Sequence, residues 1–152
     1  MNTVIKNEES NETSTNNTSQ KSYLYQIKDW DDEKIDLKVN LLRGIYAYGF
    51  EQPSAIQKKG IYPMTKFPPK DIIAQAQSGT GKTASFVVGV LQLVDLKNPK
   101  CQAVILTPTR ELAHQVASFT NAVSEYMDLT MHACVGGMES GGRAAGAGAS
   151  SA

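Results

Sequence analysis

A glycine-bearing segment in the middle of the chain has the residue types and spacing of a phosphate-binding loop. It consists of Ala76, Gln77, Ser78, Gly79, Thr80, Gly81, Lys82 and Thr83. Glycines let successive backbone N–H groups turn inward onto phosphate oxygens, and a following helix N-terminus adds partial positive charge. Alanine stands where the usual pattern has its first glycine. We expect Lys82 to reach the β and γ phosphates of a nucleotide, and the Thr83 hydroxyl to ligate Mg²⁺.

A second candidate residue is Gln57, which lies upstream of this loop. A glutamine amide places an acceptor beside a donor, which matches N6 and N7 of adenine and mismatches guanine. Gln57 is therefore expected to select ATP over GTP. Taken alone, a glutamine on a short helix is more commonly an exposed surface residue, and that alternative stays open at this point. For the loop, the alternative is a glycine-rich turn with a solvated lysine.

Strands that alternate with helices are expected to position these residues. The patterning predicts apolar strands over residues 71–74, 103–106 and 130–135, and the glycine-bearing loop follows the first of them. One predicted helix follows the loop, with Phe86, Val87, Val90, Leu91 and Val94 on one side. Another places Leu112, Val116, Phe119, Val123 and Tyr126 at helical spacing. This alternation favours parallel pairing through right-handed crossovers, so the predicted fold class is α/β with helices flanking the sheet.

Two helices are predicted upstream of the loop. Residues 35–48 carry an apolar stripe at helical spacing, which Gly44 weakens without cancelling. Residues 54–59 form a short helix for which Pro53 can occupy the first turn. Residues 1–22 have too little apolar surface to offset the conformational entropy lost on ordering, so they are expected to form a disordered leader. Residues 141–152, built from Gly, Ala, Ser and one Arg, are expected to form a flexible tail, which leaves one domain over residues 23–140.

Composition narrows the possible functions. The chain of 152 residues has 15 Lys and Arg against 15 Asp and Glu, so no global basic field indicates nucleic acid or membrane. The longest apolar run, residues 86–94, is far shorter than the ~20 residues of a membrane span. The first 22 residues lack the apolar region of a secretory signal, so a cytosolic or nuclear protein is expected. Cys101 and Cys134 lie singly in apolar runs and are predicted to be buried structural thiols.

Three segments in order resemble motifs of the DEAD-box RNA helicases. Residues 49–57 resemble the Q motif, residues 76–83 resemble motif I, and residues 108–113 match motif Ia of that family. Gly136 and Gly137 stand where the family has its GG motif. Within the family, the resemblance over about residues 30–137 is closest to the translation initiation factor 4A subfamily and its nuclear relative in exon-junction complexes. The resemblance implies a partial RecA-like P-loop domain.

The resemblance also implies ligands and site residues. ATP and Mg²⁺ would be the cofactors, with Phe50 and Gln57 at the adenine end, where the family's upstream stacking aromatic corresponds to Trp30. Trp30 could equally be a hydrophobic anchor, because its spacing to Gly49 is longer than in the family. Single-stranded or duplex RNA, but not DNA, would be held by its backbone. The residues implied in that contact are Pro108, Thr109, Arg110, Gly136 and Gly137.

The sequence departs from the family in one major respect. No Asp-Glu-Ala-Asp follows the third predicted strand, and the second RecA-like domain with its arginine finger is absent from these residues. Two functions remain open: an ATP-dependent RNA helicase of translation, represented here by an incomplete chain with initiation scaffold proteins as possible partners, or a catalytically inactive ATP- and RNA-binding fragment or regulator. A different P-loop enzyme such as a kinase is disfavoured by Gln57 and motif Ia.

Overall fold

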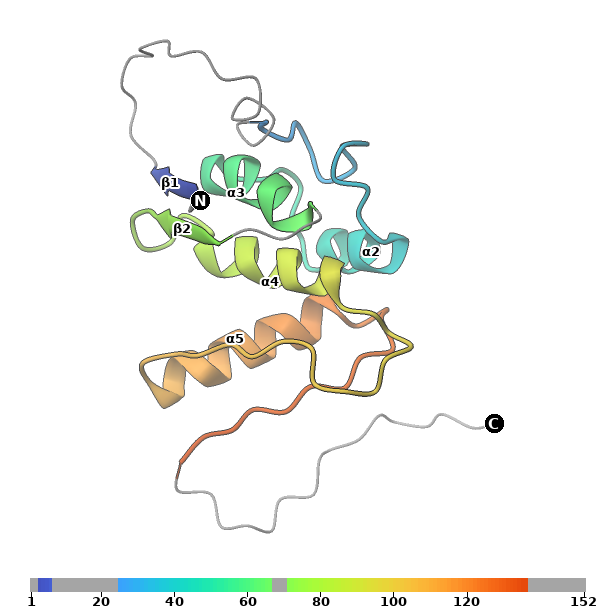
Figure 1. The fold of residues 1–152 in the computed structure, drawn as a ribbon, viewed down its shortest axis with the longest axis vertical. Coiled ribbons are helices and arrows are strands. Elements are labelled where there is room, and N and C mark those ends of the chain that lie inside the picture. The colour runs from blue at the N-terminus through green and yellow to red at the C-terminus, as the bar shows by residue number, and fades with distance from the viewer. Residues whose placement is uncertain (1–2, 7–24, 67–70, 137–152) are drawn as a thin grey trace.

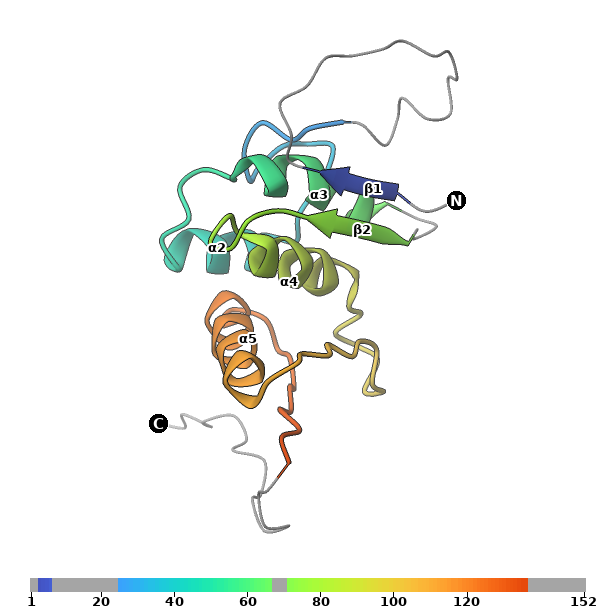
Figure 2. The ribbon, with the colours of Figure 1, turned by 90° about the vertical axis from the view of Figure 1, so that its left-hand side faces the viewer.

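The computed structural model describes residues 3–6, 25–66 and 71–136. Its elements in chain order are β1 (Thr3–Lys6), α2 (Val39–Ala47), α3 (Ala55–Thr65), β2 (Ile72–Gln75), α4 (Lys82–Leu93) and α5 (Arg110–Val123). Figures 1 and 2 show α4 between the strands and α5, and α3 packs directly against α4 as well as against both strands. None of the helices in the described ranges is long and apolar enough to cross a membrane.

The strands β1 and β2 pair in parallel and form the sheet of the described residues. In the ladder Thr3 lies opposite Ile72, and Lys6 lies opposite Gln75. β2 confirms the strand predicted over residues 71–74, shifted by one residue. The prediction of a disordered leader over residues 1–22 is wrong at residues 3–6, because a neighbouring strand supplies the backbone hydrogen bonds that composition cannot reveal. The remainder of that leader and the tail at 141–152 lie outside the described residues.

Two predicted strands do not form in the described part of the chain. Residues 103–106 and 130–135 adopt no regular structure there, and Val104 and Leu106 are 75% and 90% exposed. An apolar run becomes a strand only when another strand offers its N–H and C=O groups, and the run itself cannot supply that neighbour. Cys101 and Cys134, in the same two regions, are exposed. The prediction of buried thiols is therefore wrong for the same reason.

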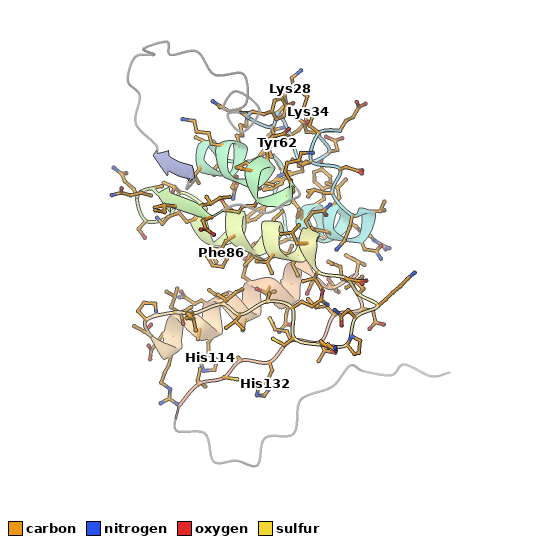
Figure 3. The ribbon with its side chains drawn as sticks, in the orientation of Figure 1. Lys28, Lys34, Tyr62, Phe86, His114 and His132 are labelled. Carbon is orange, nitrogen blue, oxygen red and sulfur yellow. The ribbon has the colours of Figure 1, made fainter. Side chains whose placement is uncertain are left out.

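The apolar faces of the helices meet in a single core cluster. The fully or nearly fully buried members include Trp30, Leu41, Ile45, Ile61, Val87, Val88, Leu91, Val116 and Val123. Phe86 is half-buried against this cluster and lies between α4 and α5 (Figure 3). The predicted stripe on α4 is thus largely confirmed, and Val88, which the stripe omits, is buried as well. Burial on more than one side follows because α4 packs against α3, α2 and α5.

The helix predicted from residue 35 begins at Val39, because Asp36 has a left-handed φ of 45° that a right-handed helix excludes. The segment before α2 is instead tied to the end of α4. The amide of Gln92 accepts a hydrogen bond from the Lys38 N–H at 2.9 Å and donates one to the Asp36 carbonyl at 2.8 Å. The Lys38 ammonium donates to the carbonyls of Leu91 and Val94, where a cation complements the helix C-terminus. Burial lowers the pKa of Lys38.

The helix predicted over residues 54–59 is longer than expected. α3 begins after Ser54, its N-cap, and continues to Thr65 with Pro63 inside it. Ser54 and Gln57 form a capping box, in which the Ser54 N–H donates to the Gln57 Oε1 at 2.6 Å. Ile56, Ile61 and Pro63 are buried, so packing of this face extends the helix beyond what local sequence preference predicts.

Candidate nucleotide-binding site

The predicted phosphate-binding loop joins the end of β2 to the start of α4. Its two glycines adopt left-handed backbone conformations, with φ of +79° at Gly79 and +97° at Gly81. Gly81 is the N-cap of α4 and provides no side-chain cap. The first N–H groups of a helix have no partner within the helix and are available to an anion. The loop therefore has the backbone shape and the helix terminus that a phosphate group requires.

Lys82 folds back over this loop. Its ammonium lies 2.5 Å from the carbonyl oxygens of both Ala76 and Gln77. The Thr80 hydroxyl also donates to the Gln77 carbonyl, at 2.8 Å. A positive charge is thus held among loop carbonyls at the mouth of the helix N-terminus, where it can exchange these acceptors for phosphate oxygens. Thr83 lies in the same first turn and is half-buried, so the residues fit both a nucleotide phosphate and a Mg²⁺ bound to it.

The start of α3 is attached to the loop by polar contacts. The Ser54 hydroxyl donates to the Thr80 carbonyl at 2.7 Å, and the Gln57 Nε2 lies 3.4 Å from the Gly81 carbonyl. The Ser85 hydroxyl donates to the same Gly81 carbonyl at 3.1 Å. Sequence reasoning did not assign Ser54 or Ser85. The Ser54–Gln57 capping-box spacing was the available signal for Ser54, although it does not reveal the contact to the loop.

Gln57 lies beside the loop, and its side chain is only 4% exposed. Its amide has two donors and two acceptor lone pairs. The contacts to Ser54 and Gly81 use one acceptor position and one donor. One donor and one acceptor position are left unused by these contacts. The contact to Gly81 is at the outer limit of hydrogen-bond length, so it is the easier one to rearrange.

Trp30 is fully buried, which favours hydrophobic anchoring over adenine stacking. Its ring stacks on Phe50 with centroids 5.9 Å apart and planes 10° from parallel. Phe50 also contacts Tyr48 and Phe119, so the two aromatic residues predicted at the adenine end, Trp30 and Phe50, belong to an aromatic cluster. The spacing between Trp30 and Gly49 is longer than in the family, and Trp30 lies inside the core.

A polar turn holds Trp30 in this position. The Asp32 carboxylate accepts hydrogen bonds from the Tyr25 hydroxyl at 2.7 Å and from the Lys28 N–H and Lys34 N–H at 3.0 Å. Partial burial opposes ionisation of Asp32, but these donors outweigh that effect and lower its pKa. These three hydrogen bonds connect the segments before and after Trp30, and they direct its indole ring inward.

The predicted RNA-contacting turn lies at the start of α5. Thr109 is the N-cap of that helix, and its hydroxyl accepts a hydrogen bond from the Leu112 N–H at 3.2 Å. Pro108 and Arg110 are exposed. α4 and α5 run in the same direction, so this turn and the phosphate-binding loop are at the same end of the two helices (Figure 1). Gly136 is exposed, and Gly137 lies outside the described residues.

Substitution of Gly81 is expected to test the contact between α3 and the loop. A Cβ at Gly81 would lie 2.5 Å from the Gln57 Nε2, whereas a Cβ at Gly79 would meet nothing within 4 Å. Gly81→Ala and Gly79→Ala share a left-handed strain of about 1–2 kcal/mol. Only Gly81→Ala displaces Gln57, so urea unfolding should show a further loss of about 1 kcal/mol. Equal losses in the two variants would contradict the contact.

A glycine-bearing loop between a strand and a helix, with a lysine folded over it, defines this chain as a P-loop nucleotide-binding domain. The family model of the DEAD/DEAH box helicases matches residues 54–146. This chain belongs to the DEAD/DEAH box helicase family.

The similar curated proteins include initiation factors. The chain is 53% identical over 118 residues to "ATP-dependent RNA helicase eIF4A" of Pyricularia oryzae, which covers 74% of this chain and 29% of that protein. It is 56% identical over 105 residues to "Eukaryotic initiation factor 4A-1" of Arabidopsis thaliana, with 69% and 25% covered. The predicted resemblance to the initiation factor 4A subfamily is confirmed. The chain spans 25–29% of the length of these relatives.

Solved structures of the family have a similar fold. Saccharomyces cerevisiae Dbp5 bound to RNA and ADP BeF3 matches with a TM-score of 0.64 and 39% identity, over 68% of this chain and 26% of that one. A DEAD box protein of Methanococcus jannaschii matches with a TM-score of 0.57 and 39% identity, over 65% and 26%. These matches confirm the predicted class, a partial RecA-like α/β domain, although two of its expected strands are not formed here.

Proposed function

We propose that this chain is the ATP-binding front part of an ATP-dependent RNA helicase of the DEAD-box type, similar to initiation factor 4A. The observation that carries the proposal is the placement of the Lys82 ammonium between two loop carbonyls, at the N-terminus of α4. In this position Lys82 binds the β and γ phosphates of ATP, and Thr83 holds Mg²⁺. The metal, when bound, neutralises phosphate charge, and the chain itself provides the backbone cradle.

Adenine selection is assigned to Gln57 through the donor and acceptor positions that its capping contacts leave unused. Phe50 supports this end of the site by packing, since it lies in the aromatic cluster that also contains Trp30, Tyr48 and Phe119. Trp30 supports it only indirectly, from the core. The catalytic roles proposed for Lys82 and Thr83 are to bind and neutralise phosphate.

RNA is proposed to contact the turn at the start of α5 and the glycines Gly136 and Gly137. Arg110 is exposed at this turn, and the α5 N-terminus adds partial positive charge beside it. The Thr109 hydroxyl is already an acceptor for the helix, and its hydrogen atom can still be donated to a phosphate. Contacts of this kind recognise the RNA backbone and do not read base sequence. One solved relative is described as bound to RNA.

The proposed cellular role follows from the relatives that are named initiation factors. We place the protein in the cytoplasm, with the nucleus as the alternative compartment. Scaffold proteins of translation initiation are its proposed protein partners, and RNA rather than DNA is its proposed nucleic acid.

Titration with ATP and GTP in the presence of Mg²⁺ tests this proposal. Lys82→Ala should weaken ATP binding roughly ten- to hundredfold, because it removes a charge-assisted hydrogen bond to phosphate. Gln57→Ala should instead reduce the ratio of ATP to GTP affinity. That ratio separates adenine selection from a general loosening of the loop, which would weaken both nucleotides alike.

Lys100→Ala provides the matched control, since Lys100 is an exposed lysine on the loop before residue 101. It should bind ATP as the unchanged chain does. Equal ATP affinity in the Lys82→Ala and Lys100→Ala variants would refute phosphate binding by the loop. An unchanged ATP to GTP ratio in Gln57→Ala would refute adenine selection by that residue.

A further inference from the structure

The N-terminal strand β1 occupies the sheet edge beside the strand that leads into the phosphate-binding loop. Figure 2 shows β1 beside β2. The four residues of β1 are in register with β2, and the last pair, Lys6 and Gln75, is immediately before Ala76. β1 also contacts α3. Because the two strands are parallel, both carboxyl ends point to the edge of the sheet where the loop begins.

Within the described residues, β1 is the strand to which β2 is hydrogen-bonded. A four-residue strand without such a partner would expose unpaired N–H and C=O groups. The side chains of β2 provide little compensation, because they alternate between half-buried and exposed, and Ile73 is 52% exposed. The ladder to β1 is therefore a principal restraint on the backbone of β2.

The loop has a different restraint at each end. At its α4 end, Ser54 and Gln57 bind the carbonyls of Thr80 and Gly81. At its β2 end, the residues before Ala76 are held by the ladder to β1. The Lys82 ammonium contacts the carbonyls of Ala76 and Gln77, so movement of that end changes the position of the lysine's partners.

We propose that Thr3–Lys6 is an intrachain strand donor that orders the β2 end of the phosphate-binding loop and so maintains its capacity for nucleotide. β1 is close to the loop in space but distant from it in sequence. It positions the loop without touching the nucleotide. The part concerning nucleotide rests on the proposed function. The part concerning the order of the loop stands on the strand pairing and can be measured without any ligand.

Disulfide trapping tests the register directly. In a background with Cys101→Ser and Cys134→Ser, the pair Ile5→Cys and Ala74→Cys places two thiols on opposed residues, about 4.8 Å apart between Cα atoms. Mild oxidation should form an intramolecular bridge, detected by non-reducing electrophoresis and mass spectrometry. The control pair Thr3→Cys and Ala74→Cys is displaced by two residues, about 8 Å, and should not form the bridge. Equal bridging in both pairs, or none in either, overturns the proposal.

Hydrogen exchange tests the effect on the loop. In the unchanged chain, amides of residues 72–75 should exchange more slowly than those of residues 103–106, which form no strand. Val4→Pro with Ile5→Pro removes two N–H groups from β1 and should accelerate exchange at residues 72–81 about tenfold. Val4→Thr with Ile5→Val keeps both N–H groups and should leave the exchange rate at residues 72–81 unchanged. Protection of α4 and α5 must persist in the proline variant, which separates loss of β1 from unfolding.

Nucleotide affinity completes the test. The proline variant should bind ATP several-fold more weakly than its Thr/Val control, and the bridged Ile5→Cys, Ala74→Cys protein should keep the affinity of the unchanged chain. Unaltered exchange at residues 72–81 in the proline variant overturns the inference. If the unchanged chain binds no ATP, the proposed function fails, while the exchange and trapping results still decide the role of β1.

Discussion

Replacement of Gly44 by alanine is expected to destabilise the fold by at least about 2 kcal/mol. A Cβ at this position would lie 1.8 Å from the carbonyl oxygen of Val123, a backbone atom of α5 that cannot rotate away. Alanine is a better helix former than glycine by about 1 kcal/mol, so helix propensity alone predicts the opposite sign. The clash should prevail, because relief requires α2 and α5 to separate along a contact that buries Leu41, Ile45 and Val123.

Denaturant unfolding measures this effect, and Asn40→Ala is the matched control on the same helix. Asn40 is exposed, so its replacement gains helix propensity without a new contact and should stabilise the chain slightly. Gly44→Ala should lower the unfolding midpoint well below that of Asn40→Ala. A Gly44→Ala variant as stable as the control would mean that α2 and α5 do not approach as closely as described.

Gly44 shows what a single sequence hides. On the pattern alone it is a weakness in a helix, since glycine lowers helix propensity. In the structure it is the point at which two helices separated by more than sixty residues come into backbone contact. The apolar stripe of α2 was predictable because it depends on the 3.6-residue period of its own helix. The partner of Gly44 was not, because it lies on another element.

The same division applies to the sheet. β2, the loop and α4 follow one another in the chain, and their local patterns were sufficient to place them. Whether residues 103–106 form a strand depends on a neighbouring strand, as does the structure of Thr3–Lys6. Three predictions about pairing were therefore wrong, in both directions: two strands were expected that do not form in the described residues, and one forms inside a supposed disordered leader.

The candidate site was predicted in its local chemistry and less well in its contacts. Residues 76–83 were recognised because the loop's function depends on types and spacing within one segment. The attachment of Ser54 to the Thr80 carbonyl crosses from one motif to another and was not foreseen. Only the burial of Trp30 distinguishes hydrophobic anchoring from adenine stacking. That burial depends on the Asp32 turn and on the aromatic cluster around Phe50.

The 152-residue chain is expected to bind adenine nucleotides without hydrolysing ATP above background. Gln57 and the loop are in place for binding, but phosphoryl transfer also needs a positioned water and a charge clamp on the γ-phosphate. The sequence contains no Asp-Glu-Ala-Asp to position that water. Lack of an arginine finger alone costs about 10³–10⁵ in rate. These factors act on the reaction step and leave the ground-state contacts of Lys82 and Gln57 unaffected. Nucleotide binding should therefore be retained while ATP hydrolysis is lost.

Phosphate release, measured beside nucleotide binding, decides this prediction. The unchanged chain and Lys82→Ala should release phosphate equally slowly, while only the unchanged chain binds ATP well. A full-length initiation factor 4A, assayed in parallel with RNA, controls for the sensitivity of the measurement. Release that depends on Lys82 would contradict the prediction. A contaminating ATPase would persist in the Lys82→Ala preparation, so Lys82-dependent release would require a carboxylate of this chain to activate water beside the loop.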